Sequence, residues 1–344
     1  MGLVQRESPA PVPLSPPTPA PPRKGKGSSA GATKDKPMAR RKKGTPVHGW
    51  VVLDKPLGLT STQAVGAVRR AFNAQKAGHA GTLDPQATGI LPIALGEATK
   101  TVPFAVDGQK AYRFTVRWGT ETTTDDTEGP VVKSSESRPS RADIGAALPK
   151  FIGEVMQVPP VFSAIKVDGA RAYDLARSGE DVVLEARPVL IERLALVDQM
   201  DESTSVFEAE CGKGTYVRAI ARDMGRMLGC YGHVIALRRT RVGPFDEASA
   251  VTLSAIDDAA NLDDGGEALA KLLTPVEAAL ADLPELLVSQ TDAASLARGQ
   301  AILIRGRDAP VLSGPAFATS KGRLIALGEL DKGALHPTRV FNLG

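Results

Sequence analysis

Residues 78–89 read GHAGTLDPQATG, a glycine-punctuated segment that presents a single carboxylate, Asp84, directly before Pro85. Because proline disfavours the α region for the residue before it, we expect Asp84 in an extended segment or a turn. The apolar residues 90–95 that follow predict a buried strand. A carboxylate on such a loop, without metal ligands clustered around it, suits a nucleophile or a charge stabiliser. The alternative is an Asx-turn that only caps the loop.

Length and composition favour a soluble protein of two unequal domains. At 344 residues the chain exceeds the usual size of one domain, and 42% hydrophobic residues suffice for a real core. No apolar run approaches the roughly 18 residues of a membrane helix, and the N-terminus lacks the apolar core of a signal peptide. Two cysteines, Cys211 and Cys230, are too few for a disulfide framework in a chain of this length. These features predict a cytoplasmic protein.

The net charge of +3 conceals an uneven distribution along the chain. Residues 1–45 carry ten lysines and arginines against two acidic residues, so the rest of the chain is about −5. This basic, proline-rich arm has almost no large apolar residue and is expected to be disordered. It could attract phosphate groups or be a solvated run of charge. A body that binds RNA must therefore use a local basic surface rather than its global charge.

Hydrophobic periodicity beyond the arm predicts mixed helices and strands. Residues 112–118 alternate between large apolar and polar side chains, as in a half-buried strand. Thr60 and Ser140 each begin a helix, with Val65, Val68, Phe72, Ile144, Leu148, Phe151 and Ile152 facing inward. Because the elements lack strict βαβ alternation, we expect an α+β fold around a mainly antiparallel sheet. Further strands are expected at 50–53, 234–242, 286–288, 301–304, 324–327 and 339–341, a turn at 125–130 before Val131 and Val132, and further helices at 171–177, 216–228, 251–283 and 292–298.

Residues 78–89 resemble the catalytic motif of the pseudouridine synthases, most of all the bacterial TruB-type enzymes that isomerise uridine 55 in the T arm of tRNA. The resemblance covers residues 48–250, with its blocks in the expected order. The other blocks are VVLDKP (51–56), GEATK (96–100), AYR (111–113), PPVFSAIK (159–166), GTYVR (214–218) and HVIALRR (233–239).

The resemblance implies the following domain organisation. Residues 46–250 would form the catalytic domain, with a thumb-like insertion near 163–185. Residues 251–283 would be a helical connector. Residues 284–344 loosely resemble the small β-barrel RNA-binding domain called PUA, although a packing appendage that touches no RNA is the alternative.

The reaction of this family breaks the C1′–N1 glycosidic bond of uridine, turns the base and rejoins it through C5. It needs no cofactor, and the sequence contains neither a phosphate-binding loop nor a dinucleotide fingerprint. Cys211, Cys230 and His233 lack the spacing of known zinc sites, so we expect no metal.

By resemblance, Asp84 is the essential residue, which attacks the ribose or the base or assists bond cleavage through its charge. A buried carboxylate stays ionised only beside a cation, and Arg218 matches the arginine that fills this role. Alone, Arg218 would be read as an exposed helix residue. Tyr112 matches the tyrosine that stacks on the flipped uracil and takes part in proton transfer; otherwise it is a core strand aromatic.

The remaining candidates concern substrate binding. Leu237 matches an apolar wall of the uracil pocket, a role that resembles ordinary core packing. His79 matches a histidine that contacts the T loop, although a loop histidine can be purely structural. Tyr216 belongs to the same block as Arg218. Lys55 and Lys166 are either phosphate or scaffold contacts.

These observations predict a monomeric tRNA pseudouridine synthase that needs no obligatory protein partner. One rival is a synthase of the same chemistry that depends on guide RNA and protein partners. The other is a non-catalytic module that grips and folds the T arm, against which the intact set of Asp84, Tyr112 and Arg218 argues.

Overall fold

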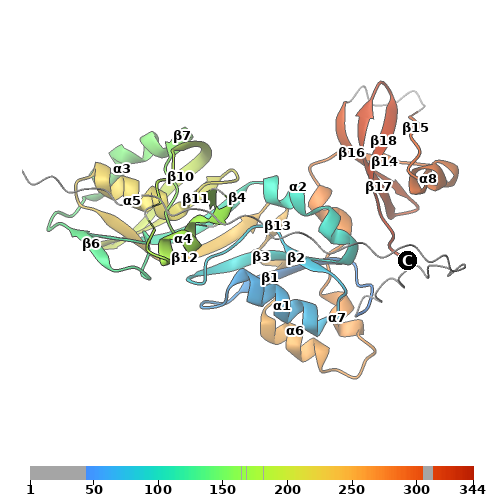
Figure 1. Ribbon diagram of the computed structural model, residues 1–344, viewed down its shortest axis with the longest axis horizontal. Coiled ribbons are helices and arrows are strands. Elements are labelled where there is room, and N and C mark those ends of the chain that lie inside the picture. The colour runs from blue at the N-terminus through green and yellow to red at the C-terminus, as the bar shows by residue number, and fades with distance from the viewer. Residues whose placement is uncertain (1–43, 164, 168, 181, 305–312) are drawn as a thin grey trace, which may run out of the picture. The chain divides into compact units, whose positions relative to one another are not determined.

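A nine-stranded mixed sheet organises the first part of the computed structural model, which describes residues 44–163, 165–167, 169–180, 182–304 and 313–344 (Figure 1). Its main path runs β1–β3–β12–β4–β11–β10–β7, with β2 beside β3 and β13 beside β12. Among its described strands only β3 and β12 pair in parallel, so the predicted α+β fold with a mainly antiparallel sheet is confirmed. The strands are β1 (Gly49–Lys55), β2 (Ala77–His79), β3 (Ala87–Leu95), β4 (Lys110–Trp118), β7 (Gly153–Gln157), β10 (Arg187–Asp201), β11 (Thr204–Cys211), β12 (Gly232–Val242) and β13 (Phe245–Asp246).

The helices begin where the sequence predicts them. Thr60 caps α1 with a full capping box that Gln63 completes, and Ser140 does the same for α3 with Asp143. The prediction that Ile152 faces inward is wrong, because Ile152 follows the last turn of η2 and is 42% exposed. The elements are α1 (Ser61–Ala71), η1 (Gly96–Lys100), α2 (Val102–Asp107), α3 (Arg141–Ala147), η2 (Leu148–Phe151) and α5 (Val217–Met227).

Strands β1 and β3 are buried on both faces, which explains their continuous apolar sequences. Helices α1, α6 (Leu253–Ala260) and α7 (Glu267–Lys271) lie together on one side of these strands (Figure 1). Strand β4 instead alternates, because Phe114, Val116 and Trp118 pack in the core that α5 covers while Arg113 and Arg117 face away.

Two excursions leave the sheet. The hairpin of β5 (Thr120–Thr122) and β6 (Val131–Ser134) follows β4 and contains the predicted turn at 125–130. The predicted insertion near 163–185 contains a second hairpin, β8 (Lys166–Val167) with β9 (Ala170–Arg171), and the predicted helix α4 (Ala172–Arg177).

The helical segment after residue 250 packs into the main core. The Trp50 amide donates to the Thr274 carbonyl oxygen at 2.8 Å, and the Val251 amide donates to the Val52 carbonyl oxygen at 2.8 Å. This segment also contains η4 (Val276–Leu280), whose apolar residues share a buried cluster with Trp50, and η3 (Glu247–Ser249) precedes it. The boundaries predicted at residues 250 and 283 stay a prediction.

A separate five-stranded sheet, in the order β14–β16–β17–β18–β15, forms the C-terminal part with helix α8. It confirms the predicted small C-terminal β fold, while the residue at which that domain begins stays a prediction. Strand β16 was not predicted, and the basic arm lies outside the described residues. The elements are β14 (Glu285–Leu287), α8 (Gln290–Ala297), β15 (Ile302–Leu303), β16 (Gly314–Ser320), β17 (Arg323–Asp331) and β18 (Ala334–Val340).

Strands β10 and β11 were also missed, although they form the longest hairpin of the main sheet. Their ladder shifts register three times, between Ile191 and Arg193, between Leu196 and Asp198, and between Gln199 and Asp201. Each irregularity moves the next side chains to the other face. The skipped residues all lie on β10, so the period-2 signal is interrupted in that strand. In β11 the signal was present but overlooked, because Phe207, Ala209 and Cys211 alternate with Glu208 and Glu210.

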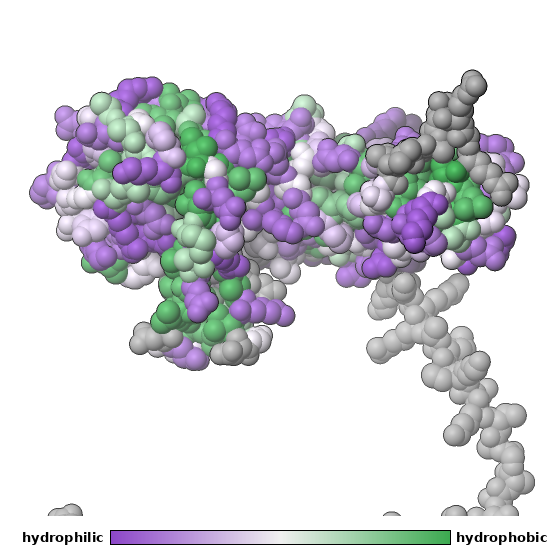
Figure 2. Space-filling view, turned by 90° about the horizontal axis from the view of Figure 1, so that it is seen from above, coloured by the Kyte–Doolittle hydropathy of each residue, from purple (hydrophilic) through white to green (hydrophobic). Residues whose placement is uncertain are grey.

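Hydrophilic and apolar residues are interspersed over the molecular surface that Figure 2 shows. Among the described residues, no helix has the length and apolar character that crossing a bilayer requires.

Candidate active site

The loop that carries Asp84 is held between the N-terminus of α1 and strand β3. Asp84 lies in neither helix nor strand, and its carbonyl oxygen accepts from the Ala87 amide at 3.0 Å across the turn at Pro85 and Gln86, in line with the predicted extended segment or turn. The buried Ser61 hydroxyl accepts from the Leu83 amide at 2.8 Å and donates to the Leu83 carbonyl oxygen at 2.9 Å. The Gly58 amide donates to the Pro85 carbonyl oxygen at 2.8 Å. The backbone on both sides of Asp84 is therefore fixed.

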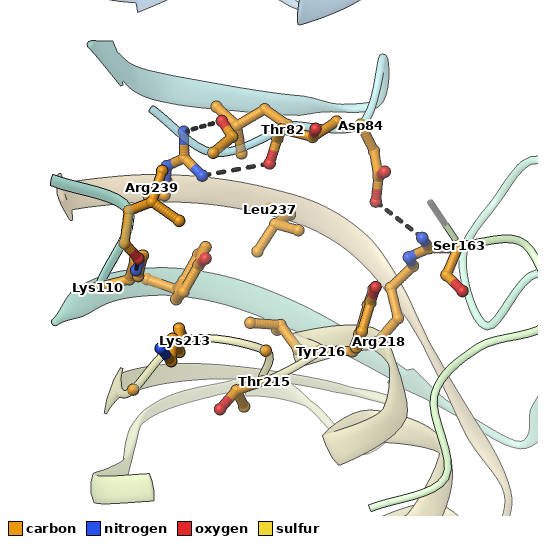
Figure 3. Close-up of a pocket in the computed structure, with 17 residues that line it drawn as sticks. Thr82, Asp84, Lys110, Ser163, Lys213, Thr215, Tyr216, Arg218, Leu237 and Arg239 are labelled. Atoms are coloured by element: carbon orange, nitrogen blue, oxygen red, sulfur yellow. Dashed lines mark hydrogen bonds and ion pairs between the residues drawn. The ribbon is translucent and has the colours of Figure 1, made fainter. Parts of the chain in front are cut away.

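Arg218, in the first turn of α5, extends toward Asp84 from the opposite wall of a pocket (Figure 3). Its Nη2 lies 2.9 Å from Asp84 Oδ2, and its Nη1 lies 3.3 Å from Asp126 Oδ2. It also donates to the carbonyl oxygens of Thr124 at 2.9 Å and Phe162 at 3.0 Å. The Arg218 side chain is 6% exposed and that of Asp84 is 40% exposed, so the arginine is fixed while the carboxylate faces the opening.

Three arginines spaced four residues apart on α5 contact the acidic segment at 121–126. Beyond Arg218, Arg222 Nη1 lies 2.9 Å from Asp125 Oδ2, and Arg226 binds Glu121 with contacts of 2.7 and 2.8 Å. Residues four apart lie on one face of a helix, so α5 presents a single row of guanidinium groups to this segment. The row attaches the 121–126 segment to α5.

Replacing Arg222 with methionine should lower the free energy of unfolding by about 3–5 kcal/mol, because Asp125 would stay buried without its partner. Chemical denaturation with circular dichroism measures this change. Adding Asp125→Asn in the same chain removes the stranded charge and should recover part of the loss. A loss below about 1 kcal/mol for Arg222→Met would show that the pair is dispensable.

The pocket between Asp84 and the sheet has a volume of about 270 Å³. This is close to the lower end of the range for small-molecule sites, roughly 300–1,000 Å³, and suits a single nucleotide base. Tyr112 on β4 and Arg239 on β12 are direct partners in the ladder, and Leu237 lies on the same face of β12 as Arg239. Burial raises the pKa of Tyr112, so this phenol stays protonated near neutral pH.

Two buried cations line the same pocket. Arg239 is 2% exposed and donates to the carbonyl oxygens of Ile90, Gly81 and Thr82. Lys110 is 6% exposed and donates to the carbonyl oxygens of Val106 and Gly108. Burial, with the nearby positive charge of Arg239, lowers the pKa of Lys110 to about 8.

Lys110 predicts a specific dependence of stability on pH. Its pKa is about 8 in the folded protein and 10.5 when unperturbed, so between these values the unfolded chain binds more protons. The contribution of Lys110 to the free energy of unfolding should therefore rise with pH, by at most about 1.4 kcal/mol per pH unit. The free energy of unfolding of the wild type minus that of Lys110→Met should increase from pH 8 to pH 10. A constant or falling difference contradicts the lowered pKa.

The structure brings five of the residues singled out in the sequence to this pocket, namely Asp84, Tyr112, Tyr216, Arg218 and Leu237. The Gln157 side-chain amide holds Tyr216 through both backbone groups, donating to its carbonyl oxygen at 3.2 Å and accepting from its N–H at 2.8 Å. Burial also raises the pKa of the Tyr216 phenol.

The other three candidates do not line the pocket. His79 is half-buried on β2 opposite Ile93, and Lys166 is exposed on β8. Lys55 is fully buried, and its Nζ donates to the carbonyl oxygens of Pro56 and Leu59 at 2.8 Å each. Of the two roles open for Lys55, the structure therefore favours a scaffold contact over a phosphate contact.

Several site residues were not recognised in the sequence: Ser61, Lys110, Asp126 and Arg239. The signal for Arg239 was present, because it follows Leu237 by two positions and shares its strand face. His233, considered as a zinc ligand, has Nδ1 3.0 Å from the Thr120 carbonyl oxygen. Within the described residues, no three His, Cys, Asp or Glu side chains are grouped as a metal site.

Fold and site together define the class: a carboxylate paired with a buried arginine, above a tyrosine-lined pocket in a mixed sheet, is the arrangement expected of a pseudouridine synthase. Residues 69–217 match the model of the TruB family pseudouridylate synthase N-terminal domain, and residues 218–281 match the tRNA pseudouridylate synthase B C-terminal domain. The chain belongs to the TruB family of pseudouridylate synthases.

Similar proteins agree with this membership. The tRNA pseudouridine synthase B of Nitrobacter winogradskyi is 61% identical over 304 residues, which cover 88% of this chain and 85% of the relative. That of Rhodopseudomonas palustris is 59% identical over 317 residues, covering 92% and 86%. Among solved structures, the archaeal box H/ACA sRNP Nop10–Cbf5 complex matches with a TM-score of 0.65 and 26% identity, covering 89% of this chain and 92% of that one.

Proposed function

We propose that this chain converts uridine 55 in the T loop of tRNA to pseudouridine, with Asp84 as the reacting carboxylate. One observation carries the proposal: Asp84 and Arg218 lie 2.9 Å apart at a base-sized pocket that Tyr112 and Leu237 line. The relatives at 61% and 59% identity bear the name tRNA pseudouridine synthase B, which supports tRNA as the substrate.

A base that stays stacked within RNA cannot enter a pocket, so the target nucleotide must first be flipped out. Tyr112 then stacks on the uracil, and Leu237 provides an apolar wall. Asp84 attacks either C1′ or C6, the C1′–N1 bond breaks, and a C1′–C5 bond forms. The hydrogen on C5 leaves as a proton and N1 gains one, so the product is an isomer of the substrate.

Arg218 has two tasks in this scheme. Its fixed charge binds and orients the Asp84 carboxylate beside the base, and its contacts with Asp126 and two carbonyl oxygens hold the guanidinium group in position. His79 and Lys166 lie outside the pocket, where contacts with the surrounding RNA are their proposed role.

The proposal includes action as a monomer in the cytoplasm, without an obligatory protein partner. A guide-dependent synthase is the second candidate, because the archaeal Nop10–Cbf5 complex has a similar fold. Its identity of 26% is far below the 61% of the tRNA pseudouridine synthase B relative, which favours the stand-alone enzyme.

Release of tritium from tRNA transcribed with [5-³H]uridine tests the proposal, because the C5 hydrogen leaves during the reaction. Purified protein alone should release the label from one uridine per tRNA. Release that requires an added guide RNA or protein would favour the second candidate. Tight binding without release would indicate a module that only grips RNA.

A further inference from the structure

Arg239 is the most deeply buried cation that lines the pocket. It is 2% exposed, and each of its three side-chain nitrogens donates to a backbone carbonyl oxygen. Within the part of the chain that the structure describes, no carboxylate oxygen lies within 4.0 Å of its guanidinium nitrogens. Burying a charge without an opposite charge is costly, so the fold keeps Arg239 here at the expense of stability.

The carbonyl partners of Arg239 lie at both ends of the loop that carries Asp84. Gly81 and Thr82 immediately precede it, with contacts of 3.1 and 3.2 Å. Ile90, on β3 after the loop, accepts from Nε at 2.8 Å. The dashed contacts in Figure 3 show the guanidinium group reaching up from β12 to this loop. One rigid guanidinium group therefore links the backbone before the loop to the backbone after it.

Arg239 also lies beside the second proposed reacting group. Tyr112 is its direct partner in the antiparallel ladder between β4 and β12. The positive charge of Arg239 opposes the rise that burial causes in the pKa of Tyr112. Asp84 and Tyr112 come from different segments of the chain. The Arg239 side chain binds the backbone of the loop that carries Asp84, and the Arg239 backbone pairs with Tyr112 in the sheet.

We propose that Arg239 is a positioning residue, whose guanidinium group sets the spacing between Asp84 and Tyr112 while the flipped base occupies the pocket. The proposal rests on the proposed function of this site. Three of the five N–H donors of Arg239 already bind backbone carbonyl oxygens, and the positioning role needs no contact with the substrate. A lysine would keep the charge, but its single ammonium group lacks the planar fork that reaches three separate carbonyl oxygens.

The test compares Arg239→Lys and Arg239→Met with Arg241→Met as the matched control. Arg241 lies two positions further along β12, is about one-third exposed and pairs with Glu210 rather than with the loop. Three quantities are measured: the single-turnover rate with saturating enzyme, the dissociation constant for tRNA, and hydrogen–deuterium exchange along the chain. The control should change none of them by more than about threefold.

For both Arg239 variants we expect the single-turnover rate to fall by roughly 100-fold or more while the dissociation constant changes less than about threefold. Exchange should rise mainly in residues 80–90. An Arg239→Lys rate within about threefold of wild type, or equal losses of rate and affinity, would overturn the proposal. So would a uniform rise in exchange across the whole sheet, which indicates a general packing role.

Failure of the proposed function gives a different result. If wild-type protein forms no pseudouridine in the same assay, that function is wrong, whereas the exchange data still report whether Arg239 fixes the loop. If Arg239→Met does not fold, Arg239→Lys decides alone, because it keeps both the charge and most of the side-chain volume.

Discussion

Asp84→Asn should reduce the single-turnover rate by about 1,000-fold or more and leave the affinity for tRNA within about threefold of wild type. Asparagine has nearly the same shape and can still accept from Arg218, so the loop keeps its geometry. It cannot carry a charge or form a covalent bond to the base or ribose. Rates measured with enzyme in excess over labelled tRNA, together with filter-binding constants, separate chemistry from binding.

Asp54→Asn is the control for this experiment. Asp54 is also a carboxylate bound by an arginine, with Arg238 Nη2 2.9 Å from its Oδ2, but it does not line the pocket. Its replacement should leave the bound-state rate nearly unchanged. Residual activity of Asp84→Asn within tenfold of wild type would contradict the assignment of Asp84.

Arg218→Ala should lower the single-turnover rate by about 100- to 1,000-fold, because the charge beside Asp84 disappears. The same change leaves Asp126, 8% exposed, without its partner, so stability should also fall, by about 3–5 kcal/mol. Arg218→Lys keeps a charge but cannot replace the contacts with two carboxylates and two carbonyl oxygens, and should stay badly impaired. Measuring rates below the melting temperature of each variant separates the two effects.

Arg226→Lys is the matched control, since Arg226 lies on the same face of α5 but binds Glu121 away from the pocket.

Replacing an arginine that only contacts phosphate would lower affinity instead of the rate of the chemical step. Binding would weaken, the salt dependence of binding would become shallower, and the chemistry of bound tRNA would stay normal. That pattern in Arg218→Ala would remove Arg218 from the active site.

The features that the sequence predicted well depend on local patterns. A capping box marks the start of α1, alternation marks β4, and the Asp84-Pro85 pair predicts an extended segment or a turn, of which the structure shows the turn. Each signal involves residues close together in the chain. The pairing of Asp84 with Arg218, which joins distant segments, followed only from the resemblance to a family, and the structure places their side chains in contact.

The features that the sequence did not reveal depend on tertiary contacts. Asp126 reads as part of an acidic turn until α5 places Arg218 against it. The spacing from Leu237 could place Arg239 on the pocket face of its strand, but nothing local shows that the side chains of Arg239 and Lys110 end among backbone carbonyl oxygens. Lys55 is the opposite case: the sequence left a phosphate contact open for it, whereas its side chain is buried and bound to backbone carbonyl oxygens, which favours a scaffold contact.

The most direct test of the central claim maps pseudouridine by position in an unmodified tRNA transcript after incubation with purified protein. Carbodiimide derivatisation followed by primer extension reports each modified position. We predict a single stop for position 55 with the wild type and none with Asp84→Asn. Modification at other positions only, or an equal signal with Asp84→Asn, would contradict the account.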